Sequence, residues 1–210
     1  MIGTPGAEIS PSPTVVAVWV LWPLGVNVHT SPATTATVAA TSLQGDQLDV
    51  QSKKTVAGKT WLQVSAHDQS GIAGWVLDDP GLVIHQSVSF HIDSDQSWSM
   101  VFPSAWNVQE PDALTGSTTL SGDNITMTVD VETPTPKFTA PGPDINDQEI
   151  EVYGKTTVLS IYRLPDGSYD LITRLKWDAQ RYFTITYHEP AATNPDTSLA
   201  LQLITGIKIT

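Results

Sequence analysis

Two short stretches decide how the first third of this chain folds: Val26-Asn27-Val28-His29-Thr30-Ser31-Pro32 and Gly74-Trp75-Val76. Between them lie short alternating patterns and turn-forming glycines, and no run has the length and period of a helix. Residues 26–28 alternate as a half-buried strand does, and the following Thr-Ser-Pro forms a turn because proline fixes φ. We therefore predict a small all-β unit at this end of the chain.

Short β-rich runs continue on both sides of these stretches. We expect strands at residues 15–21, 26–28, 36–40, 48–52, 60–64, 72–76 and 82–84. Lys53 to Gly58 is interpreted as a charged loop, and the polar residues 67–71 as the turn of a hairpin. The last run would close the strands into a small barrel, which removes exposed sheet edges.

These residues resemble the bacterial SH3 (SH3b) family, whose opening strand typically reads Leu-Asn-Val-Arg-Ser-Gly-Pro and whose last strands read Gly-Trp-Val. The resemblance covers approximately residues 14–84 and implies an SH3-like β-barrel that serves as an extracytoplasmic binding module. Where the family commonly has an arginine, this chain has His29, so a contact made through that arginine is not carried over.

The binding groove of SH3-like barrels is lined by aromatic side chains, which contact glycans or peptides at little entropic cost. The candidate ligand-binding residues here are Trp22, His29, Trp61 and Trp75, and Trp19 is a further ring in the same unit. Tryptophans in strands more often belong to a hydrophobic core, so the alternative to ligand binding for Trp61 and Trp75 is a place in the core of the barrel. Trp22 lies in a predicted turn beside a proline and is the ring we expect to be most exposed.

The rest of the chain, from residue 87, reads as a second unit. We expect strands at 88–92, 98–102, 117–121, 125–132, 149–153, 156–163, 168–177, 181–188 and 207–209. Pro165-Asp166-Gly167-Ser168 predicts a hairpin turn, and the proline-rich residues 133–147 a long loop. A single helix is predicted to begin with the cap at residues 194–197 and to end at Gly206.

The order of these elements, with the segment Phe102-Pro103-Ser104-Ala105-Trp106 after an early strand, resembles the PsbP/Mog1-like α/β group. That likeness implies an α+β sandwich on an antiparallel sheet with one late helix, and it carries no functional residue with it. We expect the aromatic segment itself to anchor the core. The predicted organisation is a disordered tether at 1–13, an SH3b-like barrel at 14–86 and a PsbP/Mog1-like domain at 87–210, giving a mainly β, α+β chain.

The charge and composition of the chain limit the classes of partner that it can bind. The net charge is −12, with seven basic and sixteen acidic side chains in residues 87–210, which disfavours nucleic acid and anionic membrane surfaces. No apolar run is long enough to span a membrane. Residues 1–13 form a Pro/Ser/Gly tether rather than a signal peptide, and we expect that a secretion or lipoprotein signal, with its lipid anchor, was trimmed from this sequence. We predict a bacterial envelope or secreted location.

Catalytic and metal chemistry find little support. The chain has no cysteine and no nucleophile motif, and Asp144-Ile145-Asn146-Asp147-Gln148-Glu149 reads as a solvated acidic loop rather than a calcium site. We therefore expect no catalytic residue, metal ligand or cofactor. The predicted function is binding of a peptidoglycan peptide or glycan, or of an envelope protein. The alternatives are a cell-wall hydrolase or its accessory subunit, and a structural assembly subunit; the oligomeric state is left open.

Overall fold

The computed structural model describes residues 16–94, 97–111, 117–132, 138–191, 195 and 197–210. Across these residues the secondary structure is mainly β, every strand pair is antiparallel and one helix lies near the end. This confirms the predicted mainly β, α+β class. Within the described ranges, no helix combines the length and the apolar character needed to cross a bilayer.

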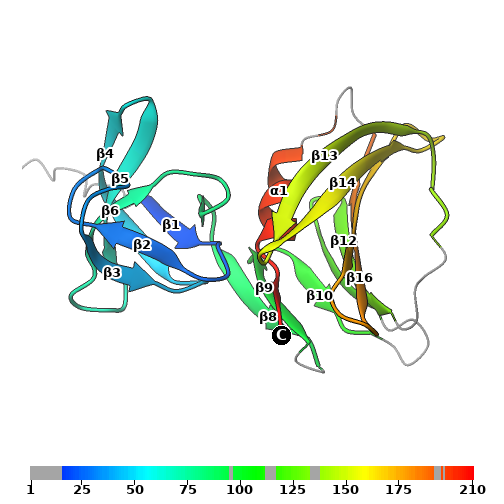
Figure 1. Ribbon diagram of the computed structural model, residues 1–210, viewed down its shortest axis with the longest axis horizontal. Helices are drawn as coiled ribbons and strands as arrows, with labels where there is room; N and C mark the ends of the chain where they lie inside the picture. Colours follow the sequence, from blue (N-terminus) through cyan, green and yellow to red (C-terminus); the bar gives the residue numbers. More distant parts are fainter. Residues whose placement is uncertain (1–15, 95–96, 112–116, 133–137, 192–194, 196) are drawn as a thin grey trace, which may run out of the picture.

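The N-terminal part of the molecule is one antiparallel sheet, drawn from blue to green on the left of Figure 1. Its strands are β1 (Val16–Val20), β2 (Val26–His29), β3 (Val38–Ser42), β4 (Gln47–Val56), β5 (Lys59–Ala66), β6 (Ala73–Leu77) and β7 (Val83–Ile84). The sheet order is β3-β2-β6-β5-β4-β1-β7. Among the described residues no ladder joins the end strands β3 and β7, so closure into a barrel stays a prediction.

Alternating side chains of this sheet fill a core of their own. Val18 and Val20 of β1, Leu48 of β4 and Val64 of β5 are fully buried in it. The predicted charged loop at Lys53 to Gly58 is wrong for most of its length. Lys53–Val56 belong to β4, and Ala57 and Gly58 alone make the turn into β5, both with positive φ. The resulting β4–β5 hairpin projects beyond the sheet (Figure 1).

The C-terminal part contains two sheets and the helix. Its strands are β8 (Val88–Ile92), β9 (Trp98–Pro103), β10 (Asn107–Gln109), β11 (Ser117–Gly122), β12 (Ile125–Glu132), β13 (Asp144–Val152), β14 (Lys155–Arg163), β15 (Tyr169–Lys176), β16 (Tyr182–Glu189) and β17 (Lys208–Ile209), and its helix is α1 (Thr197–Thr205). The large sheet has the order β10-β11-β12-β16-β15-β14-β13, and the small sheet has the order β17-β9-β8.

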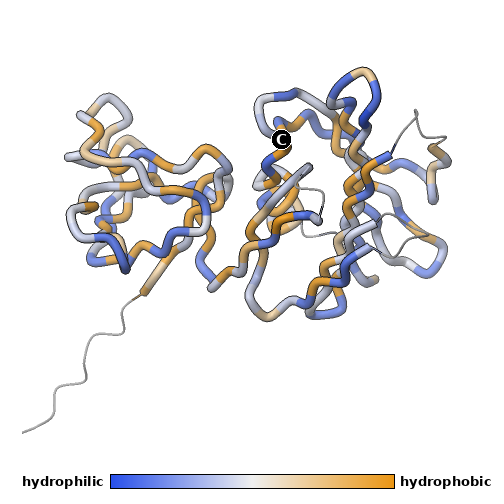
Figure 2. The backbone as a smooth tube through the Cα atoms, turned by 90° about the horizontal axis from the view of Figure 1, so that it is seen from below, coloured by the Kyte–Doolittle hydropathy of each residue, from blue (hydrophilic) through white to orange (hydrophobic). Residues whose placement is uncertain are grey.

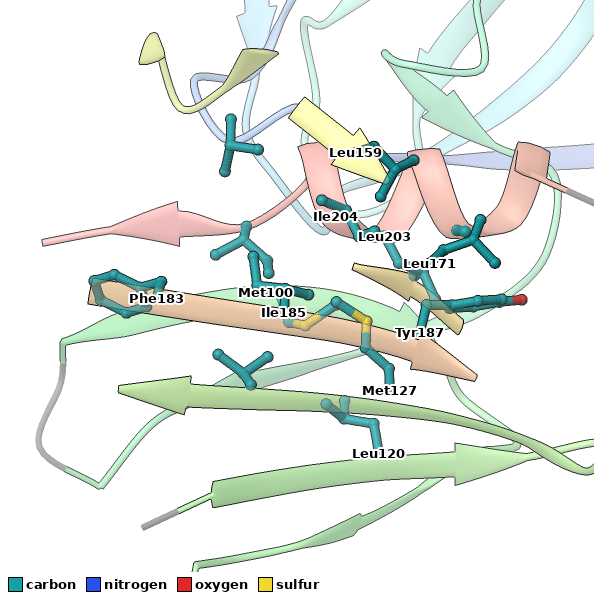
Figure 3. Close-up of a cluster of buried hydrophobic side chains, with 14 of the residues drawn as sticks. Met100, Leu120, Met127, Leu159, Leu171, Phe183, Ile185, Tyr187, Leu203 and Ile204 are labelled. Carbon is teal, nitrogen blue, oxygen red and sulfur yellow. The ribbon is translucent and has the colours of Figure 1, made fainter. Parts of the chain in front are cut away.

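The helix and the small sheet cover one face of the curved large sheet (Figure 1). Figure 3 shows Leu203 and Ile204 of α1 and Met100 of β9 pointing toward Met127 and Ile185 of the large sheet. All five side chains are fully buried. This second core is separate from that of the first sheet, and hydrophobic segments run through the strands of both parts (Figure 2).

The aromatic segment after β9 anchors this second core, as predicted. Phe102 and Trp106 are almost completely buried, and Trp106 N donates a hydrogen bond to Pro103 O at 2.9 Å. The Trp106 ring lies directly against Gly122 of β11, where a Cβ would come within 2.2 Å of it. A residue with a side chain at position 122 would displace the ring.

Two other expectations in this part need correction or fall outside the described residues. The predicted loop over 133–147 is too long, because Asp144–Val152 forms the edge strand β13. Residues 133–137 of that loop are not among those described, nor are residues 194 and 196 of the predicted helix cap. The helix begins at Thr197, and Gly206 follows its last residue, as expected.

The two parts contact each other through the turn between β3 and β4. Gln44 Nε2 donates one hydrogen bond to Leu21 O at 2.9 Å and another to Gly206 O at 2.6 Å. Leu21 is fully buried, and its Cδ1 would lie 3.0 Å from a Cβ placed on Gly206. One amide side chain therefore joins the first sheet to the turn between α1 and β17.

Candidate functional site

A hollow of about 250 Å³ opens on the N-terminal sheet, and three of the four predicted ligand-binding residues line it: Trp22, His29 and Trp61. The other lining residues are neutral, and they are Gly25, Val26, Asn27, Thr34, Val76, Leu77 and Leu82. The hollow therefore offers two indole rings, one imidazole and a few polar groups, without a carboxylate, ammonium or guanidinium group in its lining.

A tight turn after β1 holds Trp22 at this hollow. Gly25 N donates a hydrogen bond to Trp22 O at 2.9 Å, and Trp22 N donates to Leu82 O at 3.3 Å. Gly25 has a φ of +78°, and a Cβ there would lie 2.4 Å from Ser42 O. The Trp22 ring is half-buried, as are those of Trp19 and Trp75, so its expected place as the most exposed ring of this unit stays a prediction.

His29 has a fixed orientation and one uncommitted nitrogen. Its Nδ1 lies 3.0 Å from Ala36 O, and a carbonyl oxygen only accepts, so Nδ1 carries the proton. The imidazole meets the Trp61 ring edge to face, with centroids 5.7 Å apart and an interplanar angle of 87°. No described residue makes a hydrogen bond to Nε2, which leaves this nitrogen as an acceptor for a donor group of a ligand.

Trp61 lies deep in the wall of the hollow. Only 2% of its surface is exposed. Trp61 is therefore closer to a core residue than to a ring that is free to bind a ligand. It nevertheless lines the hollow and makes the perpendicular ring contact with His29. Trp61 therefore shapes the site and supports the imidazole rather than offering a full ring face to a ligand.

Trp75 is near this site but outside its lining. It pairs with His29 across β2 and β6 and with Gln63 across β6 and β5, and cross-strand partners project on the same face of a sheet. The ring is half-buried. Gly74 before it allows the two strands to approach, since a Cβ there would lie 2.4 Å from His29 O. The Gly-Trp-Val stretch thus sets the position of His29 through its glycine.

The sequence did not indicate Asn27, Thr34 or Leu82 as lining residues. Asn27 and Thr34 are exposed polar residues, and such residues carry no pattern that separates a lining from an ordinary surface position. Leu82 reaches the hollow only because β7 returns beside β1. The one local signal that could have been used is Gly25, whose position in a turn brings Trp22 and Val26 together.

Three histidines outside the hollow each pair with one carboxylate. His67 Nδ1 lies 3.0 Å from Asp49, His85 Nε2 lies 2.7 Å from Asp78, and His188 Nδ1 lies 2.7 Å from Asp170. The hydrogen bond with Asp49 raises the pKa of His67, and the same bond lowers the pKa of Asp49. The first two pairs are exposed contacts, and the third is a partly buried contact between β15 and β16.

The acidic segment at 144–149 is a strand edge rather than a liganding loop. Asp144 Oδ1 accepts a hydrogen bond from Asn146 N at 3.1 Å, and Asp147 Oδ1 accepts one from Ser160 Oγ at 2.5 Å. In the part of the chain that the structure describes, no three His, Cys, Asp or Glu side chains come together in a way that could hold a metal ion.

Comparisons with known proteins find partial structural likeness alone. No protein-family model matches the chain, and no curated protein matches it. A structure from Bacteroides thetaiotaomicron VPI-5482 is similar at 12% identity with a TM-score of 0.43, over 58% of this chain and 48% of that one. The PsbP protein CyanoP from Synechocystis sp. PCC 6803 is similar at 12% identity with a TM-score of 0.44, over 59% of this chain and 92% of that one.

The chain thus spans about half the length of the first of these structures. CyanoP belongs to the group that the second half of the sequence resembles. At these identities and TM-scores the likeness identifies no site and no ligand, and the function has to be argued from the residues of this chain.

Proposed function

We propose that this chain is a non-catalytic extracytoplasmic binding protein, in which an SH3b-like domain at residues 14–86 recognises a cell-wall peptide or glycan and a PsbP/Mog1-like domain at 87–210 supports it. The observation that carries the proposal is the hollow in which Trp22, His29 and Trp61 meet. Its volume of about 250 Å³ lies just below the usual range of ligand sites, which suits one sugar ring or a short peptide segment.

The chemistry of the lining selects the ligand class. A neutral wall with aromatic faces favours sugars and amides, which stack on rings and exchange hydrogen bonds, over phosphates, which need cationic groups. Nε2 of His29 accepts from a hydroxyl or an amide N–H, while the half-exposed face of Trp22 packs against the apolar side of the ligand. An envelope protein would have to insert a comparable side chain into the same hollow.

The first test is binding of the full chain to purified muropeptides by calorimetry. We expect Trp22→Ala to weaken binding by about tenfold, because loss of a ring in a buried contact costs on the order of 1–2 kcal/mol. Trp19→Ala is the matched control, since Trp19 is also half-buried in this sheet but does not line the hollow. Equal affinity of the Trp22→Ala variant and the wild type would contradict the assignment of the hollow.

Incubation with purified sacculi separates the alternatives. Pelleting of the intact chain with sacculi, without release of soluble fragments, supports the binding protein. Release of muropeptides by the same sample would instead show a hydrolase. If neither pelleting nor release occurs, the cell wall is not the ligand, and a structural assembly role gains ground.

A further inference from the structure

The outer strands of the small sheet are β8 and the two-residue β17, and no described residue pairs with the outer side of β8. Backbone bonds from Asp93 N to Trp98 O and from Ser104 N to Ser87 O fix which residues face β9. In an antiparallel ladder the hydrogen-bonded pairs alternate. Ser87, Ser89, His91 and Asp93 therefore direct their backbone groups to β9, and the intervening residues Val88, Phe90 and Ile92 direct theirs outward.

This edge lacks the usual protection against strand pairing. Edge strands of monomeric proteins are commonly blunted by charges, by proline or by short length. The large sheet follows that rule at β13, which carries Asp144, Asp147, Glu149 and Glu151. The five residues of β8 include no proline and no acidic or basic side chain other than the buried His91. Asp93, just beyond the strand, is itself buried and accepts a hydrogen bond from Ser97 Oγ at 3.0 Å.

Apolar side chains are exposed along the same edge. Phe90 and Ile92 are 53% and 55% exposed, and residues two apart share a face of a strand. Phe90 also lines a groove of about 370 Å³ between the two parts of the molecule, together with the exposed Leu24 and Leu43. A strand added beside β8 would place its own side chains next to Phe90 and Ile92 on this exposed face.

We propose that β8 pairs antiparallel with β8 of a second copy of this chain, about a two-fold axis at Phe90. In that register Val88 lies opposite the partner's Ile92 and Phe90 opposite the partner's Phe90. All three outward-facing residues then form hydrogen-bonded pairs, which supply about six backbone bonds. The two small sheets become one continuous sheet, and the same surface serves both copies, as a closed two-fold dimer requires.

The sequence of β8 fits a second copy better than a charged peptide. Its outward residues are apolar at each position of the symmetric register, so every cross-strand pair on that face joins two apolar side chains. The chain as a whole carries a charge of −12, so two copies repel wherever acidic surfaces meet. An uncharged strand is a surface on which such copies can meet without that repulsion.

The test measures the mass of the full chain in solution by light scattering and sedimentation over a range of concentrations. We expect a monomer–dimer equilibrium, and about tenfold or greater weakening by Ile92→Lys, because the two-fold axis counts each lost pair twice. Ile145→Lys is the matched control, since Ile145 is 50% exposed on β13. A monomer at every concentration, or a dimer unaffected by Ile92→Lys, would overturn the proposal.

Two further variants test the register itself. Val88→Glu combined with Ile92→Lys should restore the dimer, because opposite charges then face each other across the axis. Phe90→Cys should form a disulfide-linked dimer under mild oxidation, since Cα atoms of a hydrogen-bonded pair lie about 5.5 Å apart, within disulfide range. The wild-type chain has no cysteine, so Ile145→Cys is a clean control that should not become disulfide-linked. Crosslinking of both variants to the same extent would contradict the axis at Phe90.

Discussion

Two independent features of the backbone at Gly25 disfavour a side chain at this position. Its φ of +78° is strained for other residues, and a Cβ would lie 2.4 Å from Ser42 O. We expect Gly25→Ala to lower the free energy of unfolding by more than the roughly 1 kcal/mol that positive φ costs, because a backbone carbonyl must also move. Urea unfolding followed by tryptophan fluorescence measures the difference.

Gly58 provides the control for that experiment. It has nearly the same φ, +76°, but no atom lies within 4 Å of its would-be Cβ. Gly58→Ala should therefore show the conformational cost alone. If the free energy of unfolding falls by the same amount in both variants, the close approach of Gly25 to Ser42 does not contribute to the cost of Gly25→Ala.

The pair of His67 and Asp49 gives stability a pH dependence. Its hydrogen bond raises the pKa of His67 above the ordinary 6.5, so the contribution of His67 is fully present below pH 6.5 and is lost as pH rises through the raised value. Asp49 has a lowered pKa, so its contribution is present above 3.8 and is lost in acid. We expect His67→Ala to lower Tm more at about pH 5.5 than at about pH 9.

Differential scanning calorimetry at the two pH values measures this effect. Asp49→Asn serves as the second arm, because it removes the charged partner of His67 and should produce the same pattern. An equal loss of Tm at both pH values would mean that the His67 contact contributes through packing and not through its charge.

At the scale of the elements, strands with one buried face were predictable, whereas two exposed stretches of strand were missed. β8, β12 and β16 alternate and were expected near their observed bounds. The second half of β4 was not expected to be a strand, because Lys53 to Thr55 are exposed and show no apolar face. Its pairing comes from a tight turn at Ala57 and Gly58 rather than from burial.

The same reason explains the missed start of β13. Residues 144–149 are all exposed, so their sequence carries the composition of a loop while their backbone pairs with β14. By contrast, the turn at Pro165 was predictable, because proline presets its backbone: Gly167 N donates to Leu164 O at 3.0 Å. Turn chemistry is local and can be read from a few residues, whereas an exposed edge depends on its neighbour.

The candidate site was predictable in its residues but not in its arrangement. Aromatic type and turn position were enough to indicate Trp22 and Trp61, and the motif position indicated His29. Which rings share one hollow depends on the register of β2, β5 and β6, including the bulge between Val28 and His29. A one-residue shift reverses the faces of a strand, and sequence alone does not fix that shift.

At the scale of the whole molecule, Gln44 couples the two parts. Its amide donates to Leu21 O and Gly206 O, so Gln44→Ala leaves two carbonyls without this donor. We expect a loss of about 1–3 kcal/mol in the free energy of unfolding and a broader or divided thermal transition. Calorimetry of the full chain reports both.

Gln51→Ala is the matched control, because the Gln51 amide makes an exposed hydrogen bond to Ser65 within the first sheet. It should leave the transition nearly unchanged. A single unaltered transition in the Gln44→Ala variant would show that other contacts keep the parts together. No pattern in the sequence indicated this contact, since residues 44 and 206 are 162 positions apart in the chain.

The three lysines of the N-terminal part, Lys53, Lys54 and Lys59, all lie on the projecting β4–β5 hairpin (Figure 1). The C-terminal part carries most of the negative charge. The molecule is therefore an electric dipole whose positive pole is a protruding tip. The net charge of −12 repels the chain from a polyanionic surface, but the field of such a surface would turn this tip toward it, and added salt would shorten the range of both effects.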